Sequence, residues 1–540
     1  MVMRSQSGSC DRRSYGISRA LVPFRYSAFT IIWTATVVSN IGTWMYNAAS
    51  GWLMTTLDPA PLTIALVQVA TALPMFLFAL PAGALADIVN NRRLLILVEI
   101  VVVVISFVFA TLVWLGFITA FWLLVLVLLM AVGEALATPA WQRVLPQLVP
   151  NQDMPAAIDM NNVGINISRA IGPALGGVLI GAWGIVAPLW LNALSNLGVI
   201  AALILWHPSK TVADSLPAER FTSAMRTGIR HARFNLQLRA TIVRTIGFFL
   251  FASSYWALLP LIARDQFSGG PSLYGTLLGA IGLGAVGCAF VLPRLKQSFG
   301  ADCVVAGGTA GTAAALIVYA SAHRTGFALA ASVLAGASWI AAVSSLNVSA
   351  QLALPDWVRG RGLATLATAF FGSMTVGSLA WGAAATSVGV SYTLLTAAFS
   401  AVASIPLTWR WKILSGSELD LSPSLHWSAP IVLQKVENDW GPVVVSTEYR
   451  VSLDDRDAFL SALKELAAER RRNGAYDWDV YEDIAESDRY LEVFWVDSWL
   501  EYLRQHRRVT HSDQILERRV ELFHTKGPLK VTHMLGLRRR

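Results

Sequence analysis

Several long stretches of this chain carry no charged residue, and this feature constrains its fold more than any other. Residues 59–86 and 362–409 lack Asp, Glu, Lys and Arg, and residues 94–130 contain a single charged residue, Glu99. About 20 apolar residues in a helix cross the ~30 Å hydrocarbon core of a bilayer. Only 14% of the chain is charged, whereas a soluble domain carries about a quarter. The sequence therefore predicts an α-helical membrane protein.

The apolar runs, divided at internal Gly and Pro turns, predict twelve transmembrane helices. The expected spans are 28–52, 62–83, 94–116, 119–141, 157–182, 185–206, 240–262, 273–294, 303–321, 325–348, 362–385 and 389–409. Residues 142–149 and 351–358 share the pattern Gln-x-x-Leu-Pro-x-x-Val, and each follows the fourth span of its half. The repeat predicts two six-helix halves around a central cavity, as in secondary transporters.

Lys and Arg are divided unevenly between the two sides of the membrane. One side holds nearly all basic loop residues, whereas the other holds only Arg264 and Arg324. Cytoplasmic loops carry the excess of positive charge, so both termini are expected in the cytoplasm, with the helices in a bacterial-type inner (plasma) membrane. These loops account for the formal charge of +8, and no nucleic-acid partner is expected.

The chain is expected to comprise six segments. They are a cytoplasmic tail (1–25), a six-helix half (26–206), a cytoplasmic linker (207–239), a second six-helix half (240–412), a linker (413–430) and a soluble cytoplasmic domain (431–540). The last segment holds 38 of the 76 charged residues. Its alternating and clustered apolar residues predict the order β-α-β-β-α-β, which is that of a ferredoxin-like α+β domain.

A short polar loop separates the second and third spans. An aspartate in such a loop can pair with an arginine or accept hydrogen bonds from a helix N-terminus, so the loop is a candidate gate. Its Gly-x-x-x-Asp spacing, followed by Arg-Arg, resembles the loop between helices 2 and 3 of the major facilitator superfamily. The resemblance implies that Asp87 caps the eleventh span and pairs with the arginines near it. The candidate gating residues are Gly83, Asp87, Arg92, Arg93, Arg359 and Arg361.

Ionisable residues inside a membrane span are costly and by default mark a transport site or a coupling relay. Glu134 and Arg169 lie on adjacent antiparallel spans at similar depth, so we expect a buried ion pair. The pair is either static, lowering the cost of insertion, or a proton-coupled switch. Glu99 is a weaker candidate for the same role, and Arg244 is expected to anchor its helix at the interface.

Polar residues recur on one face of the first span, at Asn40, Trp44 and Asn47, and Asn166 lies in the fifth span. Amides in membrane helices either bond a neighbouring helix or line an aqueous cavity. Both interpretations remain open, and Trp44 slightly favours the cavity because its ring offers a stacking surface for an amphipathic solute.

The stretch at 172–177 favours close helix packing and a helix bend, through Gly172, Pro173, Gly176 and Gly177. It resembles the Gly-Pro-x-x-Gly-Gly motif of facilitator exporters. Together with the Asp87 loop and Arg359-Gly360-Arg361-Gly362, it makes the chain similar to the superfamily branch of siderophore (enterobactin) exporters and transmembrane secretion effectors. The resemblance implies a proton-coupled exporter of a small amphipathic drug or siderophore, working by alternating access.

Two other functions remain as alternatives: an uptake symporter, and a membrane-anchored enzyme acting through the C-terminal domain. That domain resembles the dimeric α+β-barrel group, which includes cofactor-free monooxygenases, and His506 lies where such domains often have a histidine. A surface or pairing histidine is the simpler interpretation, because no metal-ligand or nucleotide motif accompanies it and the three cysteines are scattered. We expect no cofactor, no metal and no enzymatic activity. The expected partners are a small-molecule substrate, protons, the lipid bilayer and a second copy of the chain bound through this domain.

Overall fold

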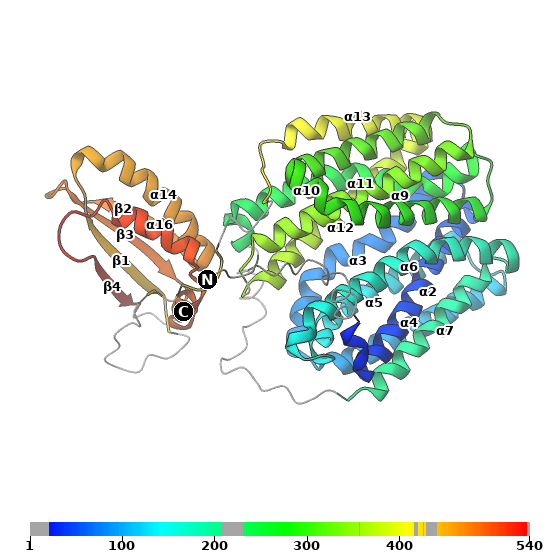
Figure 1. The fold of residues 1–540 in the computed structure, drawn as a ribbon, viewed down its shortest axis with the longest axis horizontal. Helices are drawn as coiled ribbons and strands as arrows, with labels where there is room; N and C mark the ends of the chain where they lie inside the picture. Colours follow the sequence, from blue (N-terminus) through cyan, green and yellow to red (C-terminus); the bar gives the residue numbers. More distant parts are fainter. Residues whose placement is uncertain are drawn as a thin grey trace, which may run out of the picture. The chain divides into compact units, whose positions relative to one another are not determined.

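A computed structural model describes residues 21–540 apart from 208–227, 229, 356, 415–419, 425, 428–439 and 537–540. Among the described residues, ten helices are long and apolar enough to cross a membrane. Helices α2–α7, coloured blue to teal, gather in one bundle, and helices α9–α13, green to yellow, in a second (Figure 1). The chain is a helical multi-pass membrane protein, as predicted. Much of the predicted tail and of both predicted linkers lies outside the described residues.

The first bundle consists of helices joined by short turns. They are α2 (Ser27–Leu57), α3 (Pro61–Ile88), α4 (Asn91–Trp114), α5 (Ala120–Val144), α6 (Met154–Trp183) and α7 (Val186–Leu205). The Asn90 side chain accepts a hydrogen bond from the backbone N–H of Arg93, and Thr119 accepts one from Trp122. Both contacts satisfy first-turn amides that have no partner inside the helix.

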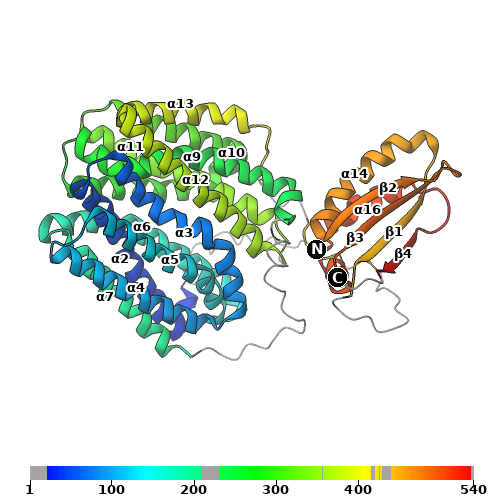
Figure 2. The same cartoon turned by 180° about the vertical axis from the view of Figure 1, so that it is seen from behind.

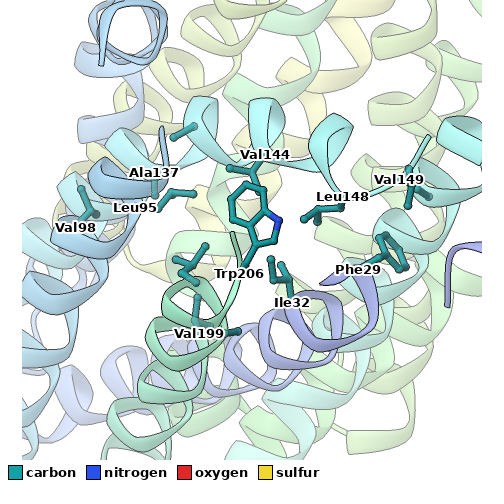
Figure 3. Close-up of a cluster of buried hydrophobic side chains, with 14 residues drawn as sticks. Phe29, Ile32, Leu95, Val98, Ala137, Val144, Leu148, Val149, Val199 and Trp206 are labelled. Atoms are coloured by element: carbon teal, nitrogen blue, oxygen red, sulfur yellow. The ribbon is translucent and has the colours of Figure 1, made fainter. Parts of the chain in front are cut away.

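A cluster of buried apolar side chains holds together one end of this bundle. Figure 3 shows Trp206 next to Val144 of α5 and Ile32 of α2, with Leu148 close by. Leu95 of α4 belongs to the same cluster. The cluster therefore fixes the ends of α2, α4 and α5 against the residue that follows α7.

The second bundle contains one unusually long helix. Its members are α9 (Leu236–Leu261, continued by η4, Ile262–Gln266), α10 (Pro271–Ser321), α11 (Thr325–Leu352), α12 (Arg359–Val388) and α13 (Val390–Thr408). Helix α10 is broken at Gly300, where φ is +76° and ψ is 163°, a conformation that favours glycine. The spans predicted at 273–294 and 303–321 lie on the two sides of this break. Helix α2, which contains Asn40 and Asn47, is not one of the ten.

The C-terminal domain is built on one antiparallel sheet. Its elements are β1 (Val443–Arg450), α14 (Arg456–Asn473), β2 (Ala475–Glu482), β3 (Arg489–Val496), α15 (Trp499–Arg508), α16 (His511–Glu521) and β4 (Lys530–Leu535). The strand order is β2-β3-β1-β4, with every neighbouring pair antiparallel. Helices α14 and α16 cover one face of the sheet (Figures 1 and 2). Their core residues include Leu463 and Val520, packed with Tyr449 and Tyr490 of the sheet.

The sequence predicted each of these strands but not helix α16. That helix is largely charged, and its apolar residues are Ile515, Leu516 and Val520, too few for a clear helical period. A capping box at Thr510 and Asp513 begins it instead.

The sheet domain forms one compact unit with the ends of three helices. The unit comprises residues 218–244, 346–366 and 411–540. Within it, the Arg508 guanidinium carbon lies 4.3 Å from the ring centroid of Trp357, and Nη2 of Arg230 lies 3.7 Å from Oε1 of Glu501. Cation–π and ionic contacts therefore join the domain to the residues before α9 and before α12.

Arg244, which the sequence placed as an anchor at the interface, is buried within the same unit. It is 3% exposed, and its Nε donates to the backbone carbonyl of Trp411 at 3.1 Å. The reason is that α9 begins at Leu236 rather than at residue 240, so Arg244 lies two turns into the helix.

Candidate functional site

Arg169 lies in the middle of α6, 15 residues after Met154 and 14 before Trp183. Its guanidinium carbon is 5.5 Å from the ring centroid of Trp44 on α2, and its Nε is buried without a hydrogen-bond partner. Tyr255 of α9 lies within electrostatic range of the guanidinium. Helix α6 therefore places a cation beside helices of both bundles.

The predicted Glu134–Arg169 ion pair is not formed between these two described residues. Glu134, an exposed residue of α5, lies within electrostatic range of Tyr46 on α2 and of Glu99 on α4. Trp44 and Tyr46 point about 160° apart around α2, since two residues turn a helix by about 200°. Arg169 and Glu134 therefore have their neighbours on different faces of α2.

Glu99 is half-buried and is an acidic neighbour of Glu134. The Trp141 side chain lies beside the Glu99 carboxylate. The structure thus brings together two carboxylates of the first bundle that the sequence treated as separate candidates, and it leaves the arginine apart from them.

The amides of α2 do not link it to its neighbours among the described residues. Asn40 and Asn47 are both half-buried, and the links from α2 are made elsewhere. Ser39 donates to Asn196 of α7, and Ser168 of α6 donates to the Val37 carbonyl at 3.1 Å. Asn166 of α6 bonds within its own helix, to the Asn162 carbonyl at 2.8 Å.

The glycine-proline stretch of α6 packs against helices of both bundles. A Cβ at Gly172 would lie 2.5 Å from the Trp44 Cβ, and one at Gly176 would lie 3.1 Å from the Met45 Cα of α2. A Cβ at Gly177 would lie 2.8 Å from the Cα of Gly275 on α10. Pro173, also in this stretch, is buried. The small residues at these positions allow the helix backbones to approach closely.

The polar loop contributes an arginine to a helix end. Nε and Nη2 of Arg92 donate to the carbonyls of Leu203 and Ile204, each at 2.8 Å, at the end of α7. Carbonyls in the last turn of a helix lack intrahelical partners, and an arginine satisfies them. Arg92 is therefore engaged with α7, whereas Arg93 is exposed.

The remaining gating candidates lie at two helix ends. Gly83 and Asp87 belong to the last two turns of α3, and the side chain of Asp87 lies outside the described residues. Arg359 and Arg361 begin α12. The predicted capping of α12 by Asp87 stays a prediction.

Sequence reasoning missed an aromatic cluster in the second bundle. Ring centroids lie 5.0 Å apart for Phe249 and Trp339, 5.3 Å for Trp256 and Trp339, and 6.0 Å for Trp339 and Phe370. Tyr255 contacts both Trp256 and Trp339. The run of aromatic residues at 248–256 could have indicated this cluster. The run has no periodicity, however, that distinguishes a cavity wall from lipid-facing packing.

Contacts between the bundles also occur away from Arg169. Arg264, after α9, donates to the backbone carbonyl of Thr55 in α2. Nearby, the Trp52 ring of α2 stacks on Tyr274 of α10 with centroids 6.1 Å apart. These contacts join the two bundles at the end of α2 that leads into α3.

His506 of the C-terminal domain has structural partners. Its ring lies 4.6 Å from Tyr502 and 5.0 Å from Trp427, centroid to centroid, and its Nδ1 is 3.1 Å from the Tyr502 carbonyl. Burial lowers the pKa of His506, so the ring is neutral near pH 7. Among the described residues, no group of three or more His, Cys, Asp or Glu side chains is placed to hold a metal.

Comparison with known families and proteins gives a consistent result. A family model described as "Transmembrane secretion effector" matches residues 18–540. The staphyloferrin A transporter of Staphylococcus aureus is 24% identical over 269 residues, which are 48% of this chain and 65% of that protein. Macrolide efflux protein A of Streptococcus pyogenes is 24% identical over 276 residues, 48% and 66% of the two chains. The chain thus spans slightly less than two thirds of these relatives.

A third relative is matched over nearly its whole length. The multidrug efflux pump Tap of Mycobacterium bovis is 24% identical over 426 residues, covering 75% of this chain and 98% of that protein. Two solved structures share the fold: a bacterial homologue of the lysosomal transporter Spinster, inward-facing and unoccupied (TM-score 0.54, 14% identity, 75% of this chain and 97% of that one), and the nucleoside transporter NupG (TM-score 0.58, 10% identity, 71% and 100%).

Proposed function

Because the chain belongs to the transmembrane secretion effector family of the major facilitator superfamily, we propose that it is a proton-coupled exporter of a small amphipathic molecule. The observation that carries this proposal is that the carboxylates of Glu99 and Glu134 lie within electrostatic range of each other in the membrane helices. The relatives of the chain include proteins described as efflux proteins. A carboxylate held in a membrane helix can bind and release a proton as its surroundings change. Such a group can couple substrate movement to the proton gradient.

Alternating access is proposed as the mechanism, with the two bundles rocking about their shared contacts. Counting α2 and the two parts of α10 on either side of Gly300 brings the proposed number of spans to twelve. The excess of basic residues in one set of loops supports cytoplasmic termini in a bacterial inner membrane. The half-buried Asn40 and Asn47, which make no interhelical hydrogen bond among the described residues, support the cavity interpretation of this face of α2.

For the C-terminal domain we propose a ferredoxin-like fold with a regulatory or dimer-forming role rather than a catalytic one. The strand order β2-β3-β1-β4 and the element order support this fold. The neutral His506, packed between aromatic rings, supports a structural role for that histidine.

Export is tested by drug accumulation in cells that express the chain. We expect the wild type to lower accumulation of at least one macrolide, dye or siderophore in a panel, and an uncoupler to restore it. Glu134→Gln should raise accumulation at least fivefold towards the level of cells without the protein, because the amide cannot exchange a proton. The matched control is Glu521→Gln, an exposed carboxylate of α16, which should export as the wild type does.

Opposite outcomes separate the alternatives. Higher accumulation with the wild type would indicate uptake. Export by Glu134→Gln that still collapses with the uncoupler would remove this residue from the coupling step.

A further inference from the structure

We propose that Arg169, Trp44 and Tyr255 form an anion-binding subsite, and that the transported substrate carries a negative charge next to an aromatic or other apolar group. The inference rests on the proposed transport function and narrows its substrate class. It replaces the interpretation of Arg169 as half of an ion pair with Glu134.

Arg169 has no acidic partner among the described residues. Arg169 lies at mid-helix in α6, its Nε is buried without a partner, and no carboxylate within the described residues pairs with it. A cation at this depth is costly, and such residues pair with a protein group or serve a ligand. A bound anion would satisfy the guanidinium with two parallel charge-assisted hydrogen bonds.

Arg169 lies close to residues of both helical bundles. Trp44 and Arg169 belong to the first bundle, whereas Tyr255 belongs to the second. Gly172, less than one turn after Arg169, has no room for a side chain against Trp44, so the backbones of α6 and α2 are held together at this level. A ligand at Arg169 would therefore lie beside elements of both halves, as a substrate of an alternating-access transporter must.

The charged and aromatic residues around Arg169 indicate what kind of ligand the site suits. Glu134 lies within electrostatic range of Tyr46, on the other face of α2 from Trp44, and Glu99 lies within electrostatic range of Glu134, so both carboxylates leave the Arg169 charge for a ligand. Tyr255, which lies within electrostatic range of Arg169, belongs to the aromatic cluster with Trp256 and Trp339. Aromatic rings give an apolar ligand surface and orientation, so the site suits a molecule with an anionic end and an aromatic or apolar body.

The test measures binding to the full-length protein in lipid nanodiscs. The probes are dansylglycine, which is anionic, and dansylamide, which has the same fluorophore without the carboxylate. We expect the wild type to bind dansylglycine at least tenfold more tightly than dansylamide. Arg169→Gln should abolish this preference while still binding dansylamide, Arg169→Lys should keep part of it, and Arg324→Gln, an exposed arginine in the loop before α11, should keep all of it.

Several results would overturn the subsite. A wild type with no preference for dansylglycine over dansylamide, or a preference that survives in Arg169→Gln, removes the anion contact. Displacement of dansylglycine by an equal concentration of inorganic phosphate would show that the ligand's aromatic body adds no affinity. That result would overturn the aromatic contacts of the proposed subsite. Empty nanodiscs measure partition into lipid, and size-exclusion profiles together with dansylamide binding show whether each variant is folded.

The binding test and the export test fail separately. Anion preference that depends on Arg169 in a protein that exports nothing would leave the subsite and overturn the exporter. Proton-driven export by a protein without anion preference would leave the exporter and overturn the subsite.

Discussion

At the residue scale, Glu469 of α14 carries the clearest pH signature. It is 2% exposed, and burial, together with the nearby Asp513 charge, raises its pKa to about 8 from an ordinary value of 4.5. The folded state therefore holds the proton more tightly, so the contribution of Glu469 to stability is present below pH 4.5 and is lost as pH rises towards 8. We predict that Glu469→Gln, which keeps an oxygen for the Asn473 amide, stabilises the sheet domain by at most about 3 kcal/mol at pH 7 and by almost nothing at pH 4.5. Hydrogen exchange of residues 456–473 in the full chain, corrected for intrinsic rates, measures the difference, and an equal effect at both pH values would contradict the assignment.

At the scale of the element, the contact between α6 and α10 depends on two glycines. A Cβ at Gly275 would lie 2.6 Å from the Gly177 Cα, which is backbone and cannot turn aside. We predict that Gly275→Ala forces the helices apart, costs about 1–3 kcal/mol, lowers the melting temperature in detergent by several degrees and reduces export. Gly287→Ala is the matched control, since it lies on the same helix and a Cβ there meets nothing within 4 Å. Equal melting temperatures for the two variants would show that this approach of α6 and α10 is not needed for stability.

At the scale of the whole molecule, the sheet domain shares a unit with the ends of α9, α11 and α12, and His231 lies inside that unit. It is fully buried, its ring is 5.5 Å from Trp357, and burial together with the charges of Arg472 and Arg508 lowers its pKa to about 3. The folded state keeps the ring neutral, so the stability that depends on it is complete above pH 6.5 and is lost as pH falls towards 3. We predict that at pH 5 the unit is weakened by about 2 kcal/mol in the wild type and much less in His231→Gln. Hydrogen exchange of residues 346–366 in the full chain at pH 5 and 7.5 tests this, and the same loss of protection in both proteins would rule out His231 as the cause.

Local physics explains which features could be predicted from the sequence. Charge-free runs of about 20 residues specify membrane helices because an unsatisfied backbone cannot cross a bilayer, and alternation in residues 445–451 specifies a half-buried strand. The close packing at Gly172 and Gly177 could also be predicted from local sequence, because a close approach of two helix backbones requires residues without a Cβ. Helix α16 and the start of α9 were missed where charged residues obscure the pattern.

The sequence by itself determined the class of the protein, its membrane helices, the four strands of its C-terminal sheet and its small-residue packing motif. Only the tertiary structure decided that Arg169 contacts Trp44 and not Glu134, that Arg92 caps α7, and that Tyr255, Trp256 and Trp339 form one cluster. A membrane helix that is apolar on every side carries little periodicity to show its rotation about its own axis. That rotation selects the partner of each polar side chain, and it is set by packing against neighbouring helices distant in sequence.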